Sequence, residues 1–362
     1  MMSLPTISII IPRKADELAD AAVQAVLYSE YPQERIEIIE VTGENPSKQR
    51  NKGAATAQGE ILYFLDNDSV VTPALFSRVV KHYEPPGTGE THGSIVGVGG
   101  PNLTPKIDNF WQKVSGYALA SFFAHFKMAA RYKPVGGVRV TGEQELILCN
   151  FSIRRDVFLQ EGGLNETLYP NEENEFLNRL ITKGHQFLYD PEAVIERSRR
   201  KDMRSFIRQL SNYGRGRAEQ ILVEGFSIQT LMFFLPSALL GYLLLLLLLN
   251  TGGKWLWWSF VPLIFYLIPA FFSAIQSARE ARNPFLLLIL PFWYLIMHLS
   301  YGAGLLWGFA NAVSTFTGKE KQRSNEVQVI VRKTLGEMDE NGLFPNVDGV
   351  FMRASLSKAS RS

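Results

Sequence analysis

The chain has 362 residues, of which 46% are hydrophobic and 20% charged, and its formal net charge is +2. The charge is unevenly spread, because only 4 of the 72 charged side chains lie in the 92 residues from Ser227 to Gly318. This distribution excludes a purely soluble protein and a disordered chain, and the single cysteine, Cys149, excludes a secreted disulfide scaffold.

The first 65 residues predict strands that alternate with helices. Strands are expected at Ile7–Ile11, Ile36–Val41 and Ile61–Leu65, with helices at Asp16–Tyr28 and from about Ser47 to Ala57 between them. This alternation is typical of βαβ units, so we expect a parallel sheet. The carboxyl ends of its strands would then share one edge, where open α/β sheets bind their ligands.

The pattern continues less regularly further along the chain. We expect a helix at Pro73–Tyr83, strands at Ile95–Val98 and Leu146–Ile153, and an amphipathic helix at Glu172–Lys183. Residues 85–89 predict a loop, and residues 106–142 are aromatic and moderately basic without a clear period.

The nearly charge-free segment predicts membrane helices. Ile228–Asn250 and Trp255–Ile275 each exceed the ~20 apolar residues that a bilayer core requires. Phe285–Thr317 is long for one span and short for two, so two to four crossings stay open. Basic residues precede the first span and follow the second, whereas the loop between carries only Lys254. This bias predicts a cell (inner) membrane protein whose N-terminal domain is cytoplasmic.

Two aspartates, Asp66 and Asp68, directly follow the third predicted strand. Carboxylates spaced in this way can hold a hard divalent cation that neutralises the charge on a departing diphosphate. The same residues are also typical of an ordinary strand-to-turn junction. From the residues alone, both interpretations stay open.

Three carboxylates, among them Glu172 and Glu173, crowd the first turn of the helix expected at Glu172–Lys183. The helix macrodipole by itself favours negative charge there. Alternatively, one glutamate is a general base that takes a proton from an acceptor hydroxyl.

A basic, aromatic helix is expected at Lys201–Arg217, just before the first span. Such a helix usually lies along the lipid headgroups. A second interpretation gives Gln209, Tyr213, Arg215 and Arg217 contact with a phosphorylated, membrane-bound substrate, since guanidinium groups suit phosphate.

Taken together and in this order, the motifs resemble glycosyltransferase family 2, over roughly Thr6 to Arg217. The segments that carry the resemblance are Ile7–Pro12, Gln49–Gly53, Ala57–Glu60, Tyr63–Asp68, Cys149–Arg155, Gly162–Glu166 and Glu172–Phe176, with Arg179 and Gly184. The spans that follow resemble the membrane-attached exopolysaccharide-type branch, which uses lipid acceptors.

The resemblance implies a Rossmann-like A-type α/β domain that binds a nucleotide-sugar, followed by α-helical transmembrane segments. It implies inversion at the anomeric carbon and a Mn²⁺ or Mg²⁺ cofactor. Asp66 and Asp68 would lie at the metal and the donor diphosphate, with Asp68 the more direct ligand. Arg50 would lie near the nucleotide or its phosphates, and Pro12 and Arg13 at the edge of the base pocket.

The resemblance also places the catalytic base at Glu172 or Glu173. We favour Glu173, because it occupies the position where the family often has aspartate. The acidic pair usual after the second strand is replaced by Val41–Gly43, so recognition of the base and ribose must differ, and Glu44 and Asn45 are candidates for this contact. Only a loose match to the motif of processive synthases is found on the basic helix, which favours transfer of a single sugar.

These expectations divide the chain into a cytoplasmic nucleotide-sugar domain (1–198), a basic amphipathic juxtamembrane helix (199–226), transmembrane helices (227–318) and a polar C-terminal tail (319–362). The expected partners are a nucleotide-diphosphate sugar, a lipid-linked acceptor and the bilayer, without nucleic acid. Two alternatives stay open. One is a polyprenyl-phosphate glycosyl transferase similar to dolichyl-phosphate-mannose synthase, whose phosphate acceptor needs no base. The other is a non-catalytic membrane scaffold that keeps the fold.

Overall fold

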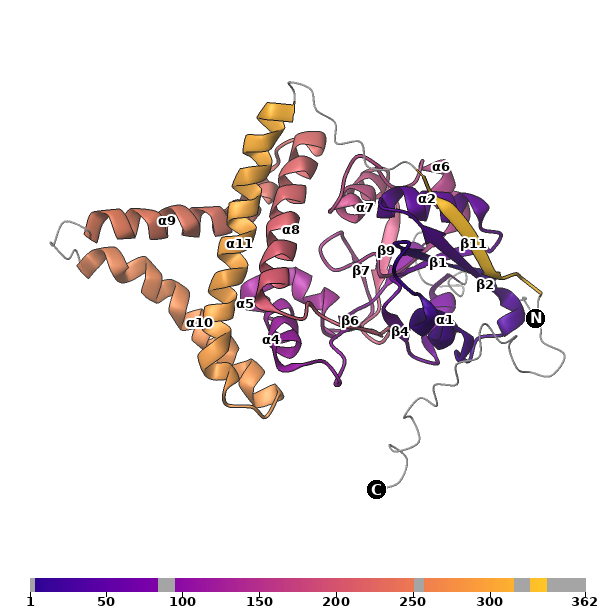
Figure 1. Cartoon of the computed structure of the whole chain (residues 1–362), viewed down its shortest axis with the longest axis horizontal. Coiled ribbons are helices and arrows are strands. Elements are labelled where there is room, and N and C mark those ends of the chain that lie inside the picture. The colour runs from indigo at the N-terminus through magenta and orange to yellow at the C-terminus, as the bar shows by residue number, and fades with distance from the viewer. Residues whose placement is uncertain (1–3, 84–94, 251–256, 316–325, 337–362) are drawn as a thin grey trace.

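The computed structural model describes residues 4–83, 95–250, 257–315 and 326–336, which form an α/β domain joined to a group of long helices (Figure 1). The loop predicted at 85–89 and most of the predicted tail, 319–362, lie outside these residues. The expected fold class, an α/β domain followed by a helical region, is confirmed.

The first half of the sheet follows the prediction closely. Its strands β1 (Ile7–Arg13), β2 (Ile36–Thr42) and β3 (Ile61–Leu65) pair in parallel in the order β2-β1-β3. Helices α1 (Asp20–Leu27) and α2 (Pro46–Thr56) connect them. The β3 residues are all buried, which explains their unbroken apolar run.

The second half of the sheet corrects the prediction of a parallel sheet. Strand β8 (Asn150–Arg154) runs antiparallel between β3 and β5 (Ile95–Gly99). Beyond β5, strand β9 (Gln186–Tyr189) is parallel and β7 (Arg139–Thr141) antiparallel. The sheet is therefore mixed, because alternation along a sequence indicates that strands exist but does not fix their direction. The predicted strand at 146–153 also starts later, since its first residues are buried in an irregular segment.

A small second sheet lies beside the carboxyl end of β3. It has the order β4-β10-β6, formed by β4 (Ser69–Val71), β10 (Ile195–Arg197) and β6 (Asn102–Leu103). Strand β10 pairs antiparallel with β4 and brings Arg197 opposite Ser69. This sheet therefore joins two segments that lie far apart in the sequence.

The remaining helices of the α/β domain are short. They are α3 (Leu75–Val80), α4 (Phe110–Leu119), α5 (Phe122–His125), α6 (Arg155–Gln160) and α7 (Glu172–Thr182). Residues 106–142, which showed no clear period, thus form two helices, a 3-10 helix and β7. The predicted helix at Glu172–Lys183 is confirmed as α7 to within one residue.

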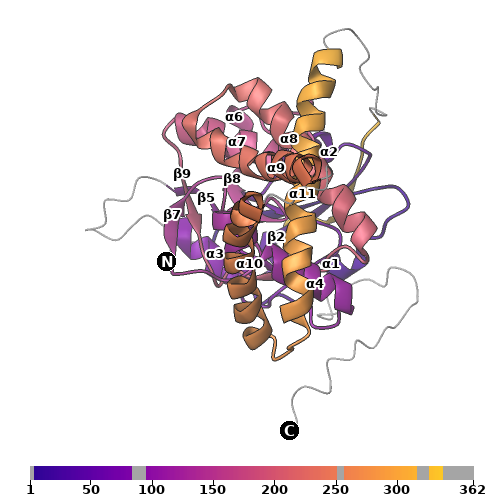
Figure 2. The same ribbon diagram turned by 90° about the vertical axis from the view of Figure 1, so that its left-hand side faces the viewer.

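Four long helices make up the second part of the molecule: α8 (Met203–Glu224), α9 (Leu235–Asn250), α10 (Val261–Glu280) and α11 (Leu286–Thr315). Helices α8 and α11 run side by side, and α9 and α10 project from them on the side away from the sheet (Figure 1). Figure 2 looks nearly along α9 and shows α11 running crosswise to it. Of the long apolar stretch at Phe285–Thr317, residues Leu286–Thr315 form one continuous helix.

The chain returns to the sheet after α11. Strand β11 (Gln328–Lys333) pairs antiparallel with the outer edge of β2. Residues from the expected polar tail thus extend the sheet. The sequence did not predict this strand, because its few apolar residues lie among charged neighbours.

Candidate active site

A cavity of ≈ 2090 Å³ lies between the carboxyl end of the sheet and the long helices. It brings together all the site residues predicted from the sequence, which are Pro12, Arg13, Arg50, Asp66, Asp68, Glu172, Glu173, Gln209, Tyr213, Arg215 and Arg217. These residues come from five separate segments of the chain, so their common location follows from the fold and not from proximity in sequence. Their individual roles stay predictions.

The cavity lining includes two aspartates that two arginines contact. Arg50 of α2 donates to Asp66 at 2.8 Å. Arg197 of β10 contacts Asp66 at 2.9 Å and donates through its Nε to Asp68 at 2.8 Å. Burial would raise the pKa of Asp66, but Arg197 and Arg50 outweigh burial and lower it. Asp66 is therefore held in its charged form.

Arg197 is a site residue that the sequence did not reveal. It lies 129 positions from Asp68, and only the pairing of β10 with β4 brings the two side chains together. In the sequence, Arg197 is one charged residue in a short alternating segment just before the basic residues that begin at Arg199. This pattern does not indicate that it pairs with the two aspartates.

The two glutamates at the start of α7 have different surroundings. Glu172 is 3% exposed and accepts a hydrogen bond from Arg50 at 3.2 Å. Burial, together with the neighbouring Glu173, raises the pKa of Glu172 to about 8. Glu173 is 19% exposed and lies 3.5 Å from Arg131. Glu173 is thus the more accessible carboxylate toward the cavity.

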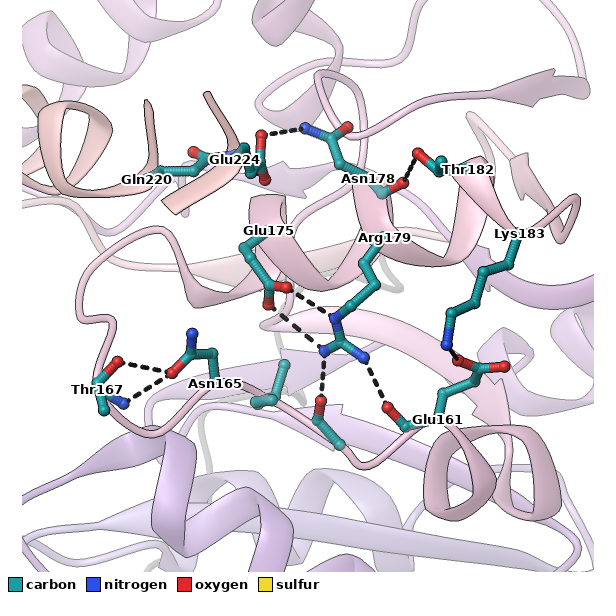
Figure 3. A network of polar contacts seen from close by, with 12 residues as sticks. Glu161, Asn165, Thr167, Glu175, Asn178, Arg179, Thr182, Lys183, Gln220 and Glu224 are labelled. Carbon is teal, nitrogen blue, oxygen red and sulfur yellow. Dashed lines mark hydrogen bonds and ion pairs between the residues drawn. The ribbon is translucent and has the colours of Figure 1, made fainter. Parts of the chain in front are cut away.

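A polar network fixes the position of α7 and therefore of both glutamates (Figure 3). Arg179 donates to Glu175 at 2.7 Å and to the carbonyl oxygens of Glu161 and Gly163. On the opposite side, Asn178 donates to Glu224 of α8 at 3.3 Å. The helix is thereby tied both to the loop that precedes it and to α8.

At the edge of the cavity near β1, two arginines form ion pairs with one buried glutamate. Arg13 donates to Glu40 at 2.7 Å, and Glu40, at 1% exposure, also accepts from Arg332 of β11 at 2.7 Å. Of the two residues considered for base and ribose contacts, Glu44 is exposed and lines the cavity. Asn45 instead caps α2 and donates to the carbonyl oxygen of Glu166, so its side chain is already engaged.

The residues predicted on the basic helix lie on α8 and reach the same cavity. Gln209 donates to the hydroxyl of Tyr213 at 2.9 Å, and burial raises the pKa of Tyr213. Arg215 donates to the carbonyl oxygen of Tyr169 at 3.3 Å. Arg217 is 4% exposed, lies 3.5 Å from Glu143 and packs over the ring of Phe233.

The cavity continues from these charged groups into an apolar region between the long helices. Its lining there includes Phe233, Leu239, Phe272 and Trp307. The polar end and the apolar end thus form one continuous space.

The chemistry of the aspartates fits a divalent cation. In the described part of the chain, no group of three or more His, Cys, Asp or Glu side chains is arranged to hold a metal ion. Asp66 and Asp68 nevertheless offer two carboxylates, and Mg²⁺ or Mn²⁺ commonly completes such a set with water and substrate phosphates. Arg197 spans the same carboxylates, so the arginine and a cation would compete for their oxygens.

The fold is that of A-type glycosyltransferases. The mannosyltransferase PcManGT from Pyrobaculum calidifontis, solved in complex with GDP-Man and Mn²⁺, has a TM-score of 0.50 and 12% identity to this chain. The match covers 86% of this chain and 88% of that one. Residues 1–349 of TarS from S. aureus, in complex with UDP-GlcNAc, match over 82% and 90% of the two chains with 11% identity and a TM-score of 0.42.

The sequence comparisons point to one family. Residues 15–158 match the model of glycosyl transferase family 2. The pre-mycofactocin glycosyltransferases of two Mycobacterium tuberculosis strains are 26% identical over 171 residues, which is 47% of this chain. The matched region spans 33% of the length of these curated relatives.

Proposed function

We propose that the chain is a membrane-attached glycosyltransferase that moves one sugar from a nucleotide-diphosphate sugar to a polyprenyl-linked or other membrane-associated acceptor, in polysaccharide or glycan assembly. The observation that carries the proposal is the continuous cavity, because it joins Asp66 and Asp68 to apolar side chains of the long helices. A lipid-linked acceptor has matching parts, a polar group to be glycosylated and an apolar chain.

The donor would bind at the polar end. Asp66 and Asp68 would hold a Mn²⁺ or Mg²⁺ ion, which when bound neutralises the charge that develops on the leaving diphosphate. Arg197 and Arg50 keep Asp66 charged, while Arg13 and Pro12 would border the nucleotide. The family match supports this assignment, as does the similar fold of an enzyme solved with GDP-Man and Mn²⁺.

The acceptor would approach from the apolar end. In a direct displacement with inversion, the acceptor oxygen forms the new bond to the anomeric carbon while the bond to the diphosphate oxygen breaks. Glu173 would take the proton that the acceptor hydroxyl loses. Glu172 is less suited to this role, because it is buried and its carboxylate already accepts a hydrogen bond from Arg50.

The membrane places the two substrates together. We propose that the α/β domain, over about residues 1–198, faces the cytoplasm at the inner membrane, and that the basic helix at 199–226 lies next to the headgroups. Anchoring confines the enzyme to the plane of its acceptor, which raises their effective concentration.

A turnover measurement tests the proposal. The purified full-length protein in lipid nanodiscs would be incubated with a panel of UDP- and GDP-sugars and Mn²⁺ in the presence of membrane lipid, and the released nucleotide measured. We expect release with at least one donor, strongly reduced in Asp68→Asn and unchanged in Glu196→Gln. Glu196 provides the matched control because it is exposed and lies next to Arg197 outside the cavity lining. If the protein neither bound nor turned over any of the donors, the scaffold alternative would be favoured.

A phosphate acceptor is the second candidate, and Arg131 favours it. This arginine lines the cavity 3.5 Å from Glu173, while its other guanidinium nitrogens donate to Gln144, Glu143 and Asn174, so a phosphate would take the place of the Glu173 carboxylate. A phosphate acceptor needs no base, so Glu173→Gln would then keep nearly full activity. A hydroxyl acceptor instead requires a loss of about 10²-fold or more in the same variant.

A further inference from the structure

Among the residues that the structure describes, three helices are long and apolar enough to cross a membrane: Thr230–Asn250, Trp257–Glu280 and Leu286–Ala312. Their surroundings differ. In the most apolar stretch of each, 11%, 22% and 44% of the residues are buried inside the protein. The first two helices, which contain α9 and α10, are therefore mostly uncovered, whereas nearly half of α11 is enclosed.

Both halves of α11 pack against the side of the molecule that carries the sheet. In its first half, Trp293 donates to Ser115 of α4 at 3.3 Å and stacks on Trp111. In its second half, a Cβ atom at Gly304 would lie 2.1 Å from the carbonyl oxygen of Ser211 on α8. A helix whose two halves both contact elements of the catalytic side cannot run away from that side through a bilayer.

The elements before and after the helices lie on the same side. Helix α8 precedes them and contributes Arg215 and Arg217 to the catalytic cavity. Strand β11 follows them and pairs with β2, where Arg332 contacts the buried Glu40 at 2.7 Å. An even number of crossings is required, so the three candidate helices cannot all span the membrane.

The charges that flank α11 agree with this arrangement. Arg279 and Arg282 precede the helix, and Lys319, Lys321 and Arg323 follow it. Since basic flanks mark the cytoplasmic ends of membrane segments, both ends of α11 are expected on one side.

We propose that only α9 and α10 cross the bilayer, as a hairpin, and that α11 lies along the membrane surface on the catalytic side. Its exposed apolar residues, among them Phe292 and Leu306, contact the lipid. Helix α8 covers another face of α11 and provides the charged groups that a surface-bound helix usually carries itself. The crosswise direction of α11 relative to α9 in Figure 2 is the direction that this surface position requires.

Depth measurement by nitroxide labels tests the proposal in the full-length protein in lipid bilayers. Phe292 and Leu306 are 57% and 48% exposed and lie 14 residues apart. In a crossing helix, labels at Phe292→Cys and Leu306→Cys would differ in depth by about 20 Å, at 1.5 Å per residue. A surface helix gives both labels nearly the same shallow depth, and Leu245→Cys on α9 a deeper one. Cys149 is buried, and the protein without added cysteines is the control.

Labelling of cysteines in sealed, oriented vesicles with a membrane-impermeant maleimide gives an independent readout. We expect Asn283→Cys and Ser324→Cys to react from the same side as Glu196→Cys on the catalytic domain, and Lys254→Cys from the opposite side. Reaction of Asn283→Cys and Ser324→Cys from opposite sides, or a depth difference of about 20 Å between the two α11 labels, would overturn the proposal.

Discussion

Arg197 and a divalent cation would use the same carboxylate oxygens, and this gives a prediction about metal affinity. Arg197 lies 2.9 Å from Asp66 and 2.8 Å from Asp68, and its side chain is 25% exposed. Replacing it with glutamine removes one positive charge next to the proposed cation. We therefore expect Arg197→Gln to bind Mn²⁺ more tightly than the unmodified protein in the absence of donor.

The expected size of this effect follows from Coulomb's law. A unit charge about 4 Å from a divalent ion repels it by about 2 kcal/mol at the dielectric constant of water. Asp68 is 46% exposed, so salt and solvent screening reduce the effect. We take about 1 kcal/mol, which corresponds to a Kd for Mn²⁺ that is about 5-fold lower.

Titration of the full-length protein with Mn²⁺, followed by electron paramagnetic resonance of the free ion, measures this affinity directly. Glu196→Gln is the control, because it removes a neighbouring charge that does not line the cavity. An unchanged or weaker affinity in Arg197→Gln would refute the reasoning, since the arginine would then not compete for the cation's ligands.

Three further predictions concern packing, pH and the returning strand. Gly304→Val would force α8 and α11 apart and lower the free energy of unfolding by about 1–3 kcal/mol, measured as a lower Tm. The control Gly241→Ala would leave the Tm nearly unchanged, because its new Cβ has nothing within 4 Å. The folded-state pKa of Glu172 is raised to about 8, so its contribution to stability is lost as the pH rises from about 4.5 to 8. The Tm of the unmodified protein should therefore fall over this window, and Glu172→Gln should flatten that fall. An equally steep fall of Tm in the variant would contradict this assignment. Arg332→Ala removes the charged hydrogen bond to Glu40, so we expect the free energy of unfolding, measured by denaturant titration, to fall by about 1 kcal/mol. An unchanged free energy of unfolding would show that β11 is held by its backbone pairing alone.

Local patterns were sufficient to predict the first half of the sheet. The strands at Ile7–Arg13, Ile36–Thr42 and Ile61–Leu65 are short, buried and rich in branched residues, and the helices between them are regular. The aspartates after β3 and the glutamates at the start of α7 were found for the same reason, because each group is contiguous in the sequence.

Long-range pairing explains what the sequence did not reveal. Arg197 reaches Asp66 and Asp68 only because β10 pairs with β4, and Arg332 reaches Glu40 only because β11 pairs with β2. The antiparallel direction of β8 is likewise decided by its neighbours in the sheet. Apolar length alone also marked the segment of α11 as a membrane helix, whereas its packing against α4 and α8 distinguishes it from α9 and α10.

Formation of a glycosylated lipid tests the central claim most directly. The full-length protein in nanodiscs that contain a membrane lipid extract would receive a radiolabelled sugar donor and Mn²⁺, and organic-phase radioactivity would be followed over time. We expect a labelled lipid with at least one UDP- or GDP-sugar, which is lost in Asp68→Asn and retained in Glu196→Gln. Transfer of the sugar only to water, or no labelled lipid with any donor, would contradict a cavity that joins the donor site to a lipid acceptor.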